Sequence, residues 1–219
     1  AAEADATRVC ELAERVLASQ QQGQGPAATK DAKQAEQETA WVQTSLEGQQ
    51  RQLDSQGLND DLLSEIKPRL TTAFARVKEA RGKLKEMMER AQVMTILREA
   101  EARVDEVESH FAKATEMDGR LAQAETGGPS AGAFTEAALK MAVQRVQAAA
   151  NNSQALLTAK KRMARTFSAE VQQYAAESLA GIEGRVAAAA EGAKGLVQAS
   201  AARQLRQAAR GASTPKPKR

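Results

Sequence analysis

Residues 134–211 read FTEAALKMAVQRVQAAANNSQALLTAKKRMARTFSAEVQQYAAESLAGIEGRVAAAAEGAKGLVQASAARQLRQAARG and decide the fold class. This stretch holds no proline, and its apolar residues recur at the three- and four-residue spacing of one helix face. The recurring positions are Leu139, Val143, Val146, Ala150, Leu157, Ala164, Phe167 and Val171, followed after a phase shift by Leu179, Ile182, Val186, Ala189, Ala193 and Leu196. One unbroken helix here would extend about 115 Å. The spacing therefore predicts a rod, a hairpin or an extended bundle.

The composition also favours an all-α fold. Apolar residues make up 42 % of the chain but aromatic residues only 3 %, because alanine supplies much of the apolar count. Alanine, glutamate, glutamine, lysine and arginine are strong helix formers, and no alternating β-branched run predicts a strand. We expect an elongated antiparallel helical hairpin or bundle with coiled-coil seams, built from two long helices and two shorter N-terminal helices.

Turn residues divide the chain into expected parts. A Gly-Gly-Pro sequence at 127–129 marks a turn between two long helical stretches, and short connections favour antiparallel neighbours. We therefore predict a hairpin with its tip near Gly128. The expected parts are 1–57, two shorter amphipathic helices packing on the hairpin; 58–126, a long helix kinked near Pro68; 127–133, the turn; 134–211, a long basic Ala-rich helix; and 212–219, a disordered basic tail.

The long helix over 58–126 carries the clearest heptad pattern. Its apolar residues alternate steps of three and four, which predicts a seam packed against neighbouring helices. The seam includes Leu63, Ile66, Leu70, Val77, Leu84, Met87 and Met94. Trp41 lies beside a weaker seam in the second of the shorter helices. We expect it to pack on a neighbouring helix, because a large aromatic side chain usually buries its area.

Charge is distributed unevenly along the chain. The net charge is +3, but residues 134–219 hold 14 Lys and Arg against 5 Asp and Glu, which is +9. Residues 1–133 hold the remaining 17 Lys and Arg and 23 Asp and Glu, which is −6. Opposite charges on facing helices set pairing and orientation, so we expect the two parts to fold against each other. The alternative is that the basic part binds an acidic partner outside the chain.

Two basic clusters are candidates for electrostatic contacts with a partner. Such clusters bind nucleic acid, anionic lipid or acidic protein surfaces, and they also occur as solvated faces or tails. Few aromatic residues accompany them for base stacking, and few bulky apolar residues accompany them for membrane insertion. The clusters consist of Lys160, Lys161, Arg162 and Arg165, and of Arg203, Arg206, Arg210, Lys216, Lys218 and Arg219.

The sequence offers little for chemistry. The single cysteine, Cys10, excludes an internal disulfide and a multi-cysteine zinc site, and the single histidine, His110, gives no convincing catalytic triad. We expect no catalytic, cofactor-binding or metal site and no small-molecule substrate. No apolar run approaches the roughly 20 residues of a membrane span. The chain starts at Ala1, which fits a trimmed chain or removal of a targeting peptide, and we expect an intracellular location, organelles included.

The patterns together favour a non-enzymatic structural or scaffold protein. It would be a subunit or linker of a larger assembly and would contact other protein chains through its helices. A second hypothesis is a membrane-surface or curvature-associated protein. A third is a binder of nucleic acid or of an acidic filament through the basic clusters. No motif is specific enough to indicate a family.

Overall fold

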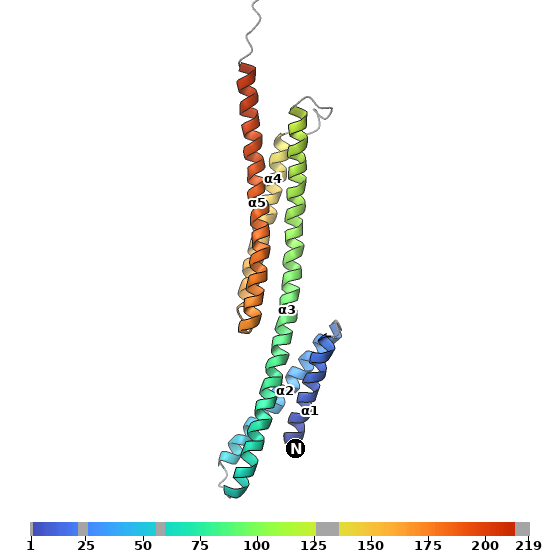
Figure 1. Ribbon diagram of the computed structural model, residues 1–219, viewed down its shortest axis with the longest axis vertical. Helices are drawn as coiled ribbons and strands as arrows, with labels where there is room; N and C mark the ends of the chain where they lie inside the picture. The colour runs from blue at the N-terminus through green and yellow to red at the C-terminus, as the bar shows by residue number, and fades with distance from the viewer. Residues whose placement is uncertain (1, 22–25, 56–59, 126–135, 213–219) are drawn as a thin grey trace, which may run out of the picture. The chain divides into compact units, whose positions relative to one another are not determined.

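The computed structural model describes residues 2–21, 26–55, 60–125 and 136–212. These ranges form five α-helices and contain no strand: α1 Ala2–Gln21, α2 Pro26–Ser55, α3 Asp60–Glu125, α4 Glu136–Ala164 and α5 Ala169–Ala212 (Figure 1). The prediction of an all-α fold is therefore confirmed, whereas the predicted number of helices is wrong. The chain divides into two compact units, unit 1 (Ala1–Gln92) and unit 2 (Val93–Arg219), and the division falls within α3.

Unit 1 is a bundle of α1, α2 and the first part of α3. Its buried side chains form two clusters. One contains Ala6, Val9, Cys10, Val42, Leu46, Leu70, Ala73 and Val77, and the other contains Ala13, Val16, Ala32, Ala35 and Leu84. From the first cluster to the second, residue numbers rise along α1 and α3 and fall along α2. Hence α1 and α3 run parallel, and α2 runs antiparallel to both.

Unit 2 is a bundle of the second part of α3 with α4 and α5. Tyr174 contacts Met94, and Arg185 pairs with Glu108, so residue numbers on α3 and α5 rise together and these helices are parallel. Two contacts between α4 and α5 run in opposite order, since Gln147 donates to the carbonyl of Ala190 and Lys161 pairs with Glu183. Thus α4 is antiparallel to both. All three helices share one continuous hydrophobic core.

The predicted single helix over 134–211 is wrong, because the chain reverses between α4 and α5. The amide and hydroxyl of Thr166 both donate to the carbonyl of Met163, at 3.1 and 2.8 Å, and this turn ends α4. Ser168 then stands at the N-cap position of α5, and Glu170 lies in its first turn. The carbonyl of Ser168 accepts the amide of Gln172 at 2.8 Å, the first hydrogen bond of α5, and a carboxylate in the first turn interacts favourably with the helix dipole. As a result α5 runs parallel to α3 instead of continuing antiparallel to it.

Other expectations fall on continuous helix or on residues that are not described. The backbone is α-helical on both sides of Pro68. The turn expected at 127–133 and the tail beyond Ala212 lie outside the described residues.

Candidate protein-interaction surface

The basic cluster at the end of α4 is half neutralised within the chain. Lys160 pairs with Glu99 of α3, and Lys161 pairs with Glu183 of α5. Arg162 and Arg165 are exposed and make no ion pair with any residue whose position is described. The predicted cluster of four therefore leaves two guanidinium groups for an outside partner.

The second basic cluster is also partly used inside unit 2. Arg203 pairs with Asp118 of α3, whereas Arg206 is exposed and has no partner in the described part of the chain. Arg210 lies in α5, but its side chain is not described, and Lys216, Lys218 and Arg219 lie outside the described residues. The acidic and basic parts of the sequence thus meet in unit 2, where α3 supplies carboxylates to cations of α4 and α5.

The predicted seam of α3 is only partly a core seam. Leu70, Val77 and Leu84 are buried in unit 1, and Met87 packs half-buried against the cluster that contains Leu84. Ile66 is 40 % exposed, so its assignment to the core is wrong. The side chain of Leu63 is not described.

Met94 is also wrongly assigned to the core, because it is 54 % exposed. It continues the heptad phase of unit 1, but in unit 2 the buried positions of α3 begin with Val93, Ile96 and Leu97. The neighbouring helices in unit 2 are α4 and α5, and they select which face of α3 is buried.

Large apolar side chains stand exposed on both units. Trp41 is 64 % exposed and Tyr174 is 47 % exposed, although they are the single Trp and the single Tyr of the chain. The expectation that Trp41 packs on a neighbouring helix is therefore wrong. A signal was present in the sequence: Gln37, Thr44 and Gly48, which share its helix face, are polar or lack a side chain. In the described part of the chain, the other exposed large apolar residues are Ile66, Met94, Met141, Met163 and Leu205.

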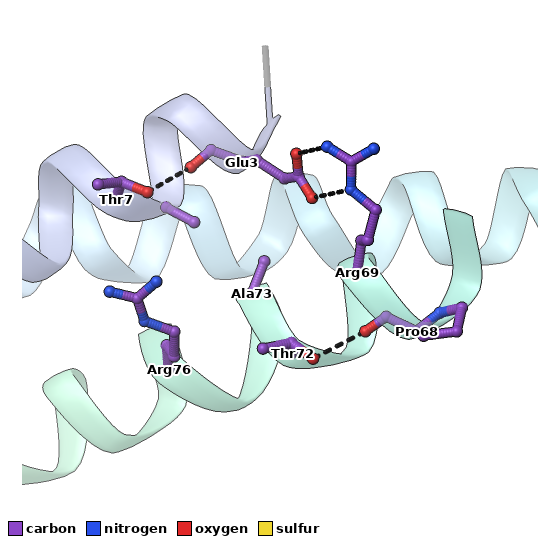
Figure 2. A pocket seen from close by; sticks show the side chains of 8 residues that line it. Glu3, Thr7, Pro68, Arg69, Thr72, Ala73 and Arg76 are labelled. Carbon is purple, nitrogen blue, oxygen red and sulfur yellow. Dashed lines mark hydrogen bonds and ion pairs between the residues drawn. The ribbon is translucent and has the colours of Figure 1, made fainter. Parts of the chain in front are cut away.

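A groove of about 380 Å³ lies between α1 and α3 in unit 1 (Figure 2). Arg69 donates two hydrogen bonds to the carboxylate of Glu3, and this pairing lowers the pKa of Glu3. Thr7 and Thr72 donate their hydroxyls to backbone carbonyls of their own helices. An ionised, paired carboxylate is poorly suited to act as a general acid.

The lone cysteine is not an activated nucleophile. Cys10 is buried in unit 1, and burial raises the pKa of its thiol, an effect that the nearby Arg76 partly opposes. A thiol with a raised pKa is largely protonated near neutral pH and reacts slowly.

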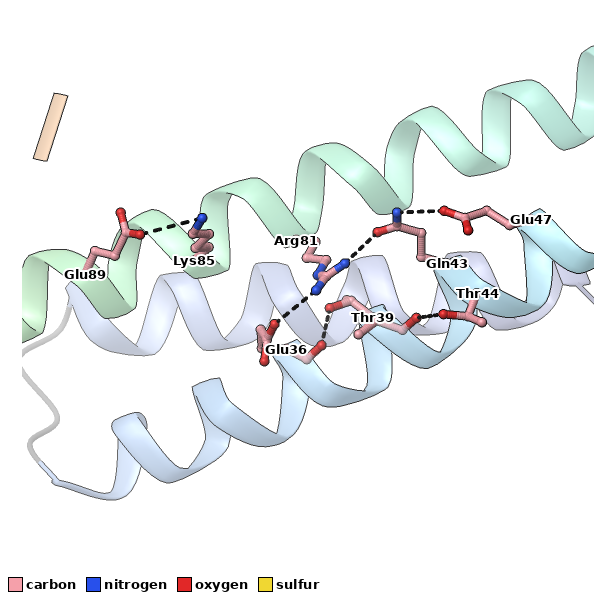
Figure 3. Close-up of polar contacts among 9 residues, drawn as sticks. Glu36, Thr39, Gln43, Thr44, Glu47, Arg81, Lys85 and Glu89 are labelled. Atoms are coloured by element: carbon pink, nitrogen blue, oxygen red, sulfur yellow. Dashed lines mark hydrogen bonds and ion pairs between the residues drawn. The ribbon is translucent and has the colours of Figure 1, made fainter. Parts of the chain in front are cut away.

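Polar side chains connect α2 with α3 (Figure 3). Arg81 of α3 lies between Glu36, at 3.5 Å, and the side-chain oxygen of Gln43, at 3.0 Å. Gln43 in turn donates to Glu47, and Asp54 pairs with Lys67. Glu36 and Asp54 are thus engaged toward α3, and Glu38 and Glu47 accept hydrogen bonds within α2.

Among the residues with described positions, no three His, Cys, Asp or Glu side chains are arranged to hold a metal ion. No helix in the described ranges is both long enough and apolar enough to cross a membrane.

Comparison of the chain with protein-family models, with curated proteins and with solved structures finds no match.

Proposed function

We propose that the protein is a non-enzymatic helical scaffold that binds other protein chains through exposed side chains on its helices. The observation that carries this proposal is the exposure of both Trp41 and Tyr174. Trp and Tyr are enriched among the residues that dominate binding energy at protein interfaces. A chain with 3 % aromatic residues would gain most stability by burying them, yet these two face solvent.

The composition of the cores supports the same proposal. Alanine, valine and leucine fill most buried positions in both units, so the bundles close without the two largest side chains. Exposed methionines at 94, 141 and 163 add polarizable apolar surface to unit 2, and methionine adapts well to varied partner surfaces. Exposed apolar groups on both units suit a scaffold with more than one contact site.

A second candidate function is binding to an anionic surface, such as a membrane or a nucleic acid. Arg162 and Arg165 favour it, because both are exposed and lack an ion-pair partner among the described residues. The pairing of Lys160, Lys161 and Arg203 within unit 2 weakens it, since three of the expected cations are already neutralised.

Affinity capture with the tagged full chain separates the two functions. Extract of the source organism would be passed over the wild type, the double variant Trp41→Ala/Tyr174→Ala and the control variant Arg162→Ala/Arg165→Ala, with washes at low and high salt. We expect defined protein partners that survive high salt, are lost with the aromatic variant and are kept by the arginine variant. Recovery of lipid or nucleic acid alone, lost at high salt and with the arginine variant, would reject the scaffold. Circular dichroism would verify that each variant is folded.

A further inference from the structure

One face of α2 in unit 1 points away from the bundle and has a composition unlike the rest of the helix. The buried residues of α2 are Ala32, Ala35, Thr39, Val42 and Leu46. On the opposite side, exposed residues recur in steps of three and four. We call them the outer face of α2, and they are Lys30, Lys33, Gln37, Trp41, Thr44, Gly48 and Arg51.

The outer face of α2 is cationic. Lys30, Lys33 and Arg51 lie on it, and none of them forms an ion pair or hydrogen bond with a residue that the structure describes. No carboxylate lies among its seven residues. Two carboxylates of α2 lie instead toward α3: Glu36 pairs with Arg81 (Figure 3), and Asp54 pairs with Lys67. Asp31 is exposed and lies about 80° around the helix axis from Trp41, so it flanks this face without belonging to it.

Trp41 occupies the middle of the outer face of α2. Thr44 and Gly48 follow it one and two turns later, and a side-chain carbon added at Gly48 would meet no atom within 4 Å. Packing within the chain therefore does not require glycine at this position. Because Gly48 has no side chain, the helix surface beside the indole of Trp41 is open to a partner. An aromatic centre with a polar surround is the usual arrangement of an interface hot spot.

We infer that the outer face of α2 binds an acidic helical segment of a partner protein, with Trp41 as the central anchor. The steps of three and four match the contacts of a helix lying along another helix. Positive charge at both ends of the face is complementary to glutamate or aspartate flanking an apolar stripe on the partner. This inference rests on the proposed scaffold function and names one of its sites.

Protein fits this face better than lipid or nucleic acid does. Trp41 is its one bulky apolar residue, and interfacial membrane helices bury a whole apolar stripe. Single-stranded nucleic acid stacks successive bases on several aromatic residues, and this face offers one.

Fluorescence provides a direct test, because Trp41 is the single tryptophan of the chain. The probe would be a synthetic helical peptide with glutamates flanking a leucine–alanine stripe, and its control the same peptide with lysine in place of glutamate. We expect a saturable blue shift of the Trp41 emission with the acidic peptide and none with the lysine peptide. With labelled peptide and anisotropy, Trp41→Ala should weaken binding about 30-fold, and Lys30→Glu/Lys33→Glu should abolish it.

The matched controls make equivalent substitutions in unit 2, outside the outer face of α2. Met141→Ala removes another exposed apolar side chain, and Lys113→Glu/Arg145→Glu reverses two exposed cations of unit 2. Both variants should bind the acidic peptide with less than about a twofold change, because none of the three residues belongs to the outer face of α2.

The inference is overturned if the acidic peptide leaves the emission unchanged, or if the charge-reversed variant binds it as the wild type does. A shift with phosphatidylserine vesicles or single-stranded DNA, but not with the peptide, would overturn it in favour of lipid or nucleic acid. Its failure is distinguishable from failure of the scaffold function. If Trp41→Ala alone retains every captured protein partner, this face is not the site, while the scaffold proposal stands.

Discussion

Unit 1 and unit 2 use the same arrangement of helix directions but fill it differently. In each, two parallel helices pack with one antiparallel helix, yet unit 1 has two hydrophobic clusters and unit 2 has one. Thr39 is fully buried between the two clusters of unit 1, and half-buried Ala80 packs against both. A single polar residue in a seam can fix register at a cost in stability. The comparison indicates that Thr39 interrupts the apolar core of unit 1, whereas the core of unit 2 is one continuous cluster that accommodates the buried Ser153 and Ser200.

Close packing in unit 2 depends on one glycine, and its replacement should have the largest effect. A Cβ at Gly192 would lie 2.6 Å from Cζ and 2.9 Å from Cε2 of Phe111, so the ring would have to move. We expect Gly192→Ala to lower the free energy of unfolding by about 1–3 kcal/mol, as overpacking does. Urea unfolding followed by circular dichroism measures the change.

Gly195 supplies the control, because it lies on the same helix and a Cβ there meets nothing within 4 Å. Gly195→Ala should raise the free energy of unfolding by up to about 1 kcal/mol through helix propensity. Equal stabilisation by both substitutions would show that the Phe111 ring yields without cost and that this contact does not distinguish unit 2.

The polar break in unit 1 predicts a smaller effect of opposite sign. The hydroxyl of Thr39 donates to the carbonyl of Glu36 in its own helix, at 2.9 Å. Replacing this hydroxyl therefore removes no hydrogen bond to another helix. Thr39→Val would place a methyl group between the two clusters and should raise the free energy of unfolding by about 1 kcal/mol. Thr44→Val, on the exposed face of α2, is the control and should change it little. Destabilisation by Thr39→Val would mean that the hydroxyl is required for packing.

Periodicity was sufficient to predict the all-α fold, but not the reversal between α4 and α5. That turn uses Arg165, Thr166, Phe167 and Ser168, without the glycine or proline that usually signals a break. The burial of α3 could not be predicted either. The heptad pattern extends to Met94, but the helices packed around unit 2 bury Val93 instead, and their positions depend on contacts distant in sequence.

The candidate surface was predictable in type but not in detail. Lys160 and Arg203 belong to basic clusters in the sequence, yet their partners Glu99 and Asp118 lie more than sixty residues away, where spacing gives no signal. For Trp41, in contrast, the polar residues that share its helix face were sufficient to predict exposure. Frequencies of tryptophan burial in proteins pointed the other way.

In each unit, a bidentate arginine–glutamate ion pair connects the two parallel helices. Low pH should weaken both ion pairs. Arg69 pairs with Glu3 in unit 1, and Arg185 with Glu108 in unit 2, where its Nε and Nη2 donate at 2.9 and 2.7 Å. Hydrogen bonding from the arginine lowers the pKa of each carboxyl group. Between the lowered folded pKa and the unfolded pKa of each carboxyl group, the unfolded state therefore binds more protons than the folded state does. The stabilisation is present above the unfolded value of about 4.3 and is lost as pH falls through the lower folded pKa.

Glu108→Gln tests this loss and should have the smallest effect, because exposed ion pairs contribute little. It should lower the urea midpoint slightly at pH 7 and by less at pH 3, because the stabilisation from this pair is lost as pH falls through the lowered pKa of Glu108. Glu101→Gln, an exposed site on the same helix without an ion pair among the described residues, should have no such pH-dependent effect. Arg185 also contacts Asp105, at 3.3 Å, and retains that partner in the variant. An equal decrease at both pH values would indicate that Glu108 stabilises unit 2 by packing rather than by charge.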